Sequence, residues 1–249
     1  MKIRSLVLLL ALGVSACGSV FQTHETAPTV YELKSPAVEA APSRVPATLR
    51  IVRPRTRPGL DSDRVTVALA DRRLDAYGGT RWSAPLPALV ESLLAAGFRA
   101  SGGWQAVVPE RSAFGGDFVL QPEIEAFEAD YSAGGPPTVR VRLRAELGLN
   151  SDRHLVAALE GSAAVHATAD RQREVIAAFE SAYGEAAAML IRAVNAAAAA
   201  APKPPGESRA ADSSASLASS HASSAVPRRR FKSARPSSSL ASSSRTPFE

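Results

Sequence analysis

The sequence has very little cysteine and histidine, and this limits the chemistry that it can carry. Its 249 residues include a single cysteine, Cys17, so no disulfide can form within the chain. The four histidines are scattered, and no two have the spacing of a zinc site: His24, His154, His166 and His221. The glycine patterns of a serine hydrolase elbow, a P-loop and a dinucleotide fold are missing as well. The sequence therefore predicts no metal site, no cofactor and no enzymatic activity.

The apolar run at the N-terminus is short and covers only residues 6–14. Nine residues are fewer than half of the roughly 20 that a membrane-spanning helix needs. The run follows Lys2 and Arg4, which is typical of a secretory signal peptide. It ends in four residues that resemble the lipobox of bacterial lipoproteins, in which a peptidase cuts before the cysteine and acyl chains are attached to it: Val14, Ser15, Ala16 and Cys17.

The lipobox resemblance implies that residues 1–16 are a lipoprotein signal peptide and that Cys17 is acylated. Residues 17–28 are small and polar, and we expect them to form a tether between the membrane and a folded domain. The mature chain is then anchored by lipid on the periplasmic face of the envelope. Gly18 favours the outer membrane, because lipoproteins kept in the inner membrane often carry aspartate there. The alternatives are an ordinary signal peptide with an incidental cysteine, or an uncleaved apolar helix.

The positive charge of the chain is confined to its C-terminal segment. Residues 202–249 hold eight Lys or Arg and three acids, which accounts for the whole formal charge of +5. The rest of the chain has no basic excess, so the sequence predicts no nucleic-acid partner. The segment holds fifteen serines and few large apolar side chains. It cannot bury enough apolar surface to offset its ordering entropy, so we predict a disordered tail over residues 202–249.

The first half of the body predicts short strands and one helix. Residues 29–33 and 48–52 are β-prone, residues 35–46 are proline-rich and predict a loop, and residues 65–69 and 73–77 predict a hairpin that Gly78 and Gly79 end. Two prolines then favour a helix start, and apolar residues at helical spacing continue to Ala96. We expect Gly97 to end this helix.

The second half predicts an antiparallel meander and a long helix. Residues 118–128, 139–149 and 155–165 alternate between apolar and polar, with a bulge expected around Ala126 and Phe127. Residues 171–201 carry an apolar stripe at helical spacing: Ile176, Phe179, Tyr183, Ala186, Leu190 and Val194. The order of elements predicts one α+β domain over residues 29–201. In this fold, two helices pack on one face of an antiparallel sheet built from a hairpin and a meander.

Two groups of side chains are candidate contacts for a partner or for lipid. Arg140, Arg142 and Arg144 form a row on one strand face, and Tyr77, Arg81 and Trp82 surround the Gly78-Gly79 pair. The alternative for the arginines is solvation and cross-strand pairing with nearby glutamates, namely Glu123, Glu125 and Glu128. The alternative for Trp82 is a core anchor at the start of the helix; it is a contact candidate if its ring is exposed.

Taken together, several segments resemble the ABC-type transport auxiliary lipoproteins, a family associated with Mce-type lipid transporters. The matching segments follow the lipobox at Cys17 in the family's order over residues 17–195. They are Tyr31-Glu32-Leu33, Asp63-Arg64-Val65, Leu74-Asp75-Ala76-Tyr77, Arg81-Trp82, Leu89 with Leu93-Leu94, Phe118-Val119-Leu120, Ile124-Glu125-Ala126-Phe127-Glu128 and Val175-Ile176-Ala177-Ala178-Phe179. The tail from residue 202 is not part of this pattern.

The resemblance implies a non-enzymatic part of a phospholipid transport system between the inner and outer membranes. The implied partners are an Mce-domain substrate-binding protein and its ABC permease and ATPase. A homo-oligomer is a further expectation, because an apolar sheet edge or face can be covered by a second copy. The competing hypothesis is an envelope structural or assembly lipoprotein that binds peptidoglycan or another anionic polymer through its basic tail.

Overall fold

The structure, a computed structural model, describes residues 27–71 and 73–201. The expected signal peptide, the lipobox with Cys17, most of the tether and the tail from residue 202 lie outside the described residues. Neither helix of the described chain is long and apolar enough to cross a lipid bilayer.

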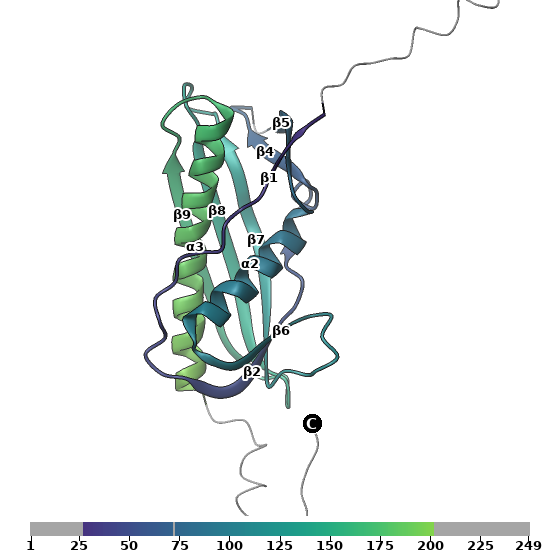
Figure 1. Cartoon of the computed structure of the whole chain (residues 1–249), viewed down its shortest axis with the longest axis vertical. Helices are drawn as coiled ribbons and strands as arrows, with labels where there is room; N and C mark the ends of the chain where they lie inside the picture. The colour runs from purple at the N-terminus through teal and green to yellow at the C-terminus, as the bar shows by residue number, and fades with distance from the viewer. Residues whose placement is uncertain (1–26, 72, 202–249) are drawn as a thin grey trace, which may run out of the picture. The chain divides into compact units, whose positions relative to one another are not determined.

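Nine strands of the described residues form one sheet, and two helices pack against it (Figure 1). The strands are β1 (Thr29–Tyr31), β2 (Val45–Ile51), β3 (Arg55–Thr56), β4 (Arg64–Ala68), β5 (Leu74–Trp82), β6 (Trp104–Pro109), β7 (Phe118–Asp130), β8 (Thr138–Leu149) and β9 (Leu155–His166). The helices are α2 (Leu86–Ser101) and α3 (Gln172–Ala200).

Strand β7 is the centre of the sheet. Along one side it pairs antiparallel with β8, which pairs antiparallel with β9. Along its other side it pairs parallel with β2, β3 and β4 in succession. Strand β6 continues the sheet beside β2, and β5 and β1 continue it beside β4. The α+β class, the β4–β5 hairpin and the β7–β9 meander are confirmed, within a sheet that is mixed and mostly antiparallel.

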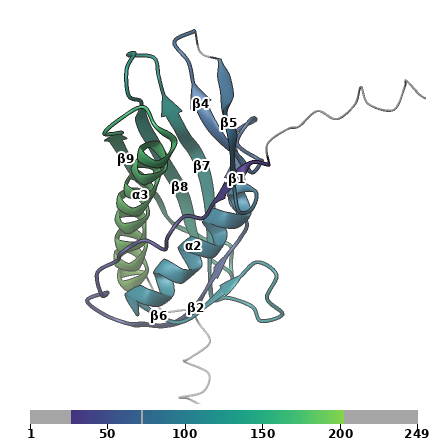
Figure 2. The ribbon, with the colours of Figure 1, turned by 45° about the horizontal axis from the view of Figure 1, so that its top comes forward.

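Both helices cover the same face of the sheet (Figure 2). Helix α3 lies along β8 and β9, and α2 lies over β6 and contacts α3. The apolar stripe predicted for residues 171–201 is buried throughout. Its Phe179 ring packs against Trp82 and Phe127, with ring centroids 5.3 Å away in each case. The opposite face of β8 carries the exposed arginines, as the alternation predicted.

Helix α2 runs further than the sequence indicated. The prediction that Gly97 ends it is wrong: the helix continues to Ser101 and ends at Gly102, which has the left-handed φ of 65°. Gly97 is instead buried inside the helix. A Cβ there would come within 2.6 Å of the Ile191 Cδ1 atom of α3 and 3.0 Å of the Pro36 Cγ atom, so a larger residue would force these side chains to shift.

Two strand irregularities also differ from the prediction. The bulge in β7 lies at Glu125, between Ile124 and Ala126, one to two residues before the predicted place. Strand β5 does not end at Tyr77. It continues through both glycines to Trp82, with a register shift against β4 and a φ of 63° at Gly79. The glycines therefore bend this strand without ending it.

The first described strand, β1, lies near the start of α3, and the described residues end just after the other end of this helix. Thr29 of β1 pairs with Thr80 of β5, and the Thr80 hydroxyl accepts a hydrogen bond from Gln172 at the start of α3. Helix α3 has 29 residues, so its ends are about 43 Å apart. In Figure 1, β1 and the end of α3 lie toward opposite ends of the long axis.

Candidate functional site

The arginine row on β8 is tied to acidic groups on both neighbouring strands. Arg140 Nη2 lies 2.9 Å from Asp130 Oδ2, and Arg144 Nη1 lies 2.9 Å from Glu125 Oε1 on β7. Glu160 on β9 forms ion pairs with two arginines: its Oε1 lies 3.4 Å from Arg142 Nε, and its Oε2 lies 3.9 Å from Arg144 Nη2. Cross-strand pairing, the alternative considered for this row, therefore describes its geometry.

The acidic partners are only partly those expected. Of the three glutamates, Glu125 pairs with the row, whereas Glu123 and Glu128 pair with Arg55 and Arg57 near β3. The outer face of the sheet thus alternates in charge. A partner that docks there has to replace existing ion pairs, which favours a surface of similarly mixed charge. Docking through Arg140, Arg142 and Arg144 stays a prediction.

Asp130 is held on this face by two groups, one on each carboxylate oxygen. The Ser132 amide donates a hydrogen bond to Asp130 Oδ1 at 2.8 Å, and Arg140 contacts the other oxygen. Hydrogen bonds from Ser132, supported by the charge of Arg140, hold the pKa of Asp130 below its usual value. Asp130 is therefore ionised at neutral pH and keeps Arg140 in place.

Replacing Arg142 and Arg144 with alanine should change the free energy of unfolding by less than about 1 kcal/mol, because exposed ion pairs contribute little. Urea unfolding of the double variant checks this. The same variant can then be used for partner capture: loss of capture without loss of stability would support docking at this face. Arg55→Ala is the matched control. It also removes an exposed arginine that is paired with a glutamate, Glu123, but Arg55 lies in β3, on the side of β7 away from β8. A large stability loss in the double variant would contradict the expectation.

The second candidate group does not form one surface. Trp82 is 2% exposed and packs edge-on against Phe127 and Phe179. The condition for a contact role, an exposed ring, is not met, and Trp82 is a core anchor at the end of β5. Arg81 is held by Asp63, with both carboxylate oxygens at 3.0 Å from Nη1.

Tyr77 of β5 belongs to a small hydroxyl cluster. It lies beside Tyr131, whose hydroxyl donates to Asp170 Oδ1 at 2.8 Å. Burial and these neighbours raise the pKa of Tyr131. Tyr77 and Arg81 line one shallow hollow, and Arg140 and Arg142 line another. Tyr77 and Arg81 stay candidate contacts, separate from the arginine row.

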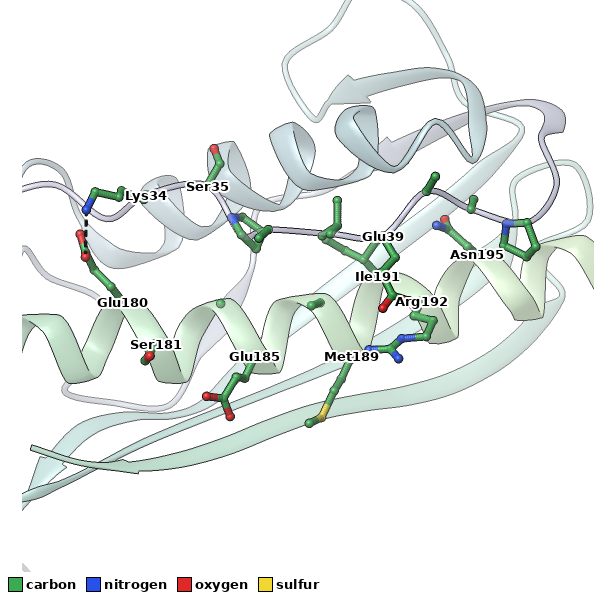
Figure 3. Close-up of a pocket in the computed structure, with 18 of the residues that line it drawn as sticks. Lys34, Ser35, Glu39, Glu180, Ser181, Glu185, Met189, Ile191, Arg192 and Asn195 are labelled. Carbon is green, nitrogen blue, oxygen red and sulfur yellow. Dashed lines mark hydrogen bonds and ion pairs between the residues drawn. The ribbon is translucent and has the colours of Figure 1, made fainter.

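A groove that the sequence analysis missed lies on the helical face. Residues 34–42, which we call the strap, cross from β1 towards β2 without helix or strand and run alongside α3 (Figure 3). Strap and helix enclose an open groove of about 940 Å³. At one end Lys34 Nζ lies 3.3 Å from Glu180 Oε2, and Asn195 lies near the other end.

The floor of the groove is made of small residues on the outer face of α3. Ala177, Ser181, Gly184 and Ala188 line it at spacings of three and four, with Met189 and Arg192 further along. This spacing was visible in the sequence, but only contact with the strap makes it a groove. The lining combines apolar side chains with five charged ones, Lys34, Glu39, Glu180, Glu185 and Arg192, so its chemistry suits an amphipathic partner. Over residues 27–71 and 73–201, no three metal-ligating side chains gather together.

The chain is similar to one protein family and to several solved structures. The sequence profile of the ABC-type transport auxiliary lipoprotein component matches residues 31–190. The crystal structure of protein XCC0632 from Xanthomonas campestris is 26% identical with a TM-score of 0.61; the match covers 68% of this chain and 95% of that one. An uncharacterised protein of known structure has 15% identity and a TM-score of 0.52, with 68% and 99% covered. A PelC dodecamer from Paraburkholderia phytofirmans has 15% identity and a TM-score of 0.37, with 63% and 94% covered. The search of curated proteins finds no match.

Proposed function

The chain belongs to the family of ABC-type transport auxiliary lipoprotein components, and from this premise we propose that it is a non-catalytic, lipid-anchored subunit of an Mce/ABC-type transporter that moves phospholipid between the inner and outer membranes. The observation that carries the proposal is the family match, which extends from the last residue of β1 into α3 and so includes strands β2 to β9 and α2.

The described domain supports a role in docking. One face of the sheet is a charged surface of paired arginines and carboxylates. On the helical side lies an open groove with a floor of small residues and charged side chains along its walls. A domain with two such different surfaces can hold two partners at once, as a subunit that bridges parts of a transport system must.

The finer part of the proposal concerns place and partners. The chain is anchored through an acylated Cys17, on the periplasmic side of the outer membrane. Its partners are an Mce-domain substrate-binding protein and, through it, an ABC permease and ATPase. These steps come from the lipobox and from the family resemblance.

The test is capture of the acylated, tagged full chain from its own membranes in mild detergent, with proteins and lipids identified by mass spectrometry. We expect an Mce-domain protein with its permease, bound phospholipid, and a diacylglyceryl mass on Cys17. Recovery of peptidoglycan or outer-membrane assembly proteins alone would overturn the transport proposal and favour the structural alternative.

Two variants separate the anchor from the docking surfaces. Cys17→Ser should abolish acylation and move the protein out of the membrane fraction, while the folded domain still captures the partner from a detergent extract. Deletion of residues 202–249 should leave capture unchanged. If the deletion instead abolishes envelope retention of the Cys17→Ser protein, binding of an anionic polymer by the basic tail is the better account.

A further inference from the structure

Strand β9 leaves a long edge of the sheet open. Among the described residues it pairs only with β8, along twelve residues from Leu155 to His166. Sheet edges are usually protected by lysine, proline or a covering segment. The β9 sequence contains no lysine and no proline, and its one acid, Glu160, is already paired with Arg142 and Arg144. This edge is therefore available for pairing with another strand.

The hydrogen-bond pattern shows which residues face the open edge. The Ala167 amide donates to the Pro137 carbonyl at 2.9 Å, so in this antiparallel ladder the odd-numbered residues of β9 exchange their bonds with β8. The even-numbered residues from 158 to 166 then direct their N–H and C=O groups outwards. Their side chains are exposed: Ala158, Glu160, Ser162, Ala164 and His166.

We propose that β9 pairs antiparallel with β9 of a second copy of this chain, about a two-fold axis at Ser162. This register pairs the outward groups of each strand with one another, as an antiparallel ladder requires. On the helical side it places Leu159 opposite the partner's Val165, so two half-buried aliphatic side chains cover each other at two symmetric positions. The sheet becomes continuous through the dimer.

Charge disfavours the register that is centred on Glu160. With Ser162 at the axis, Glu160 lies opposite the partner's Ala164 and no like charges meet. A shift that brings Glu160 to the axis would place two carboxylates directly opposite each other, which destabilises a strand pair. The proposal extends the expectation of a homo-oligomer to a specific edge and does not depend on which transporter the chain serves.

Cysteine cross-linking of the full chain in its membranes tests the register. Ser162→Cys should give a covalent dimer under mild oxidation, because directly opposed Cα atoms lie about 5.5 Å apart, within disulfide range. Ala158→Cys should give none, since the two copies of residue 158 would be about 26 Å apart. Ala158→Cys combined with His166→Cys should restore the dimer. The wild-type chain is the control for the Cys17 thiol. A disulfide-linked dimer of the wild-type chain would mean that Cys17 is not acylated, and it would say nothing about β9.

Charge variants at Ala164 give a second, independent readout of the dimer by sedimentation in detergent. Ala164→Glu should weaken association about tenfold, because it meets the partner's Glu160 twice, whereas Ala164→Lys should leave it intact or strengthen it. Ala164 lies opposite Arg140 of β8 within the same chain. Glutamate at position 164 should therefore favour the fold and lysine should disfavour it, which is the reverse of their expected effects on the dimer. A change in the stability of the fold therefore cannot explain the expected result. A monomer, a larger ring, or equal cross-linking through residues 158 and 162 would overturn the proposal.

Discussion

Gly161→Ala is expected to lower the free energy of unfolding by about 3 kcal/mol, the largest loss we predict for a one-carbon change in this domain. Gly161 lies where the backbones of β9 and α3 approach closely. A Cβ there would overlap the Ala186 carbonyl oxygen and lie 3.0 Å from the Leu190 amide nitrogen. Both are backbone atoms, so no side-chain rotation can relieve the clash. Helix α3 would have to move away from β8 and β9, along which it packs.

Urea unfolding of the full chain, followed by circular dichroism, measures this effect. Gly184→Ala is the matched control, because it makes the same chemical change in α3 at a position where a Cβ meets nothing within 4 Å. Alanine is a better helix former than glycine, so we expect this control to gain about 0.5–1 kcal/mol. A Gly161→Ala variant as stable as the wild type would show that α3 does not lie this close to β9.

Asn195→Ala should lower the free energy of unfolding by about 2–3 kcal/mol. The Asn195 side chain joins three elements: its Oδ1 accepts from Trp104 Nε1 at 2.8 Å, and its Nδ2 donates to Ser101 Oγ at 3.1 Å. All three residues are buried, with 2–6% exposure. Alanine leaves the buried indole N–H without its partner and adds a cavity at the junction of α3, α2 and β6.

A double variant identifies the cause of that loss. If the stranded indole N–H carries much of the cost, Asn195→Ala and Trp104→Phe together should cost less than the sum of their separate effects. Arg192→Ala, an exposed position one turn earlier in α3, should change stability by less than about 0.5 kcal/mol. Additive losses in the double variant would mean that the cavity dominates.

Local pattern was enough to predict the elements with strong periodicity. The alternation in β8 and the stripe in α3 each place apolar side chains on one face, and both faces are buried. The row of Arg140, Arg142 and Arg144 likewise follows from strand geometry alone. Cross-strand pairing was a sound alternative for it because acidic residues alternate on the neighbouring strand.

What the sequence did not reveal depends on contacts between distant segments. The parallel pairing of β2, β3 and β4 with β7 has no signal in the local sequence, because turn residues indicate only hairpins between neighbouring antiparallel strands. Gly97 resembled a helix end, whereas it packs against Ile191 and Pro36, two residues that are far from it in the sequence. The groove beside α3 requires both the strap and the helix, which are more than 130 residues apart in the sequence.

The placement of β1 and of the end of α3 at opposite ends of the domain has a mechanical consequence. Tension between the two would run along α3, which the sheet braces over its length. The force would act first on the three-residue parallel pairing of β1 with β5. Once that pairing breaks, the strap would be the next segment to separate from α3. The helix and meander thus act as a rigid strut, and β1 with the strap is the part that yields first.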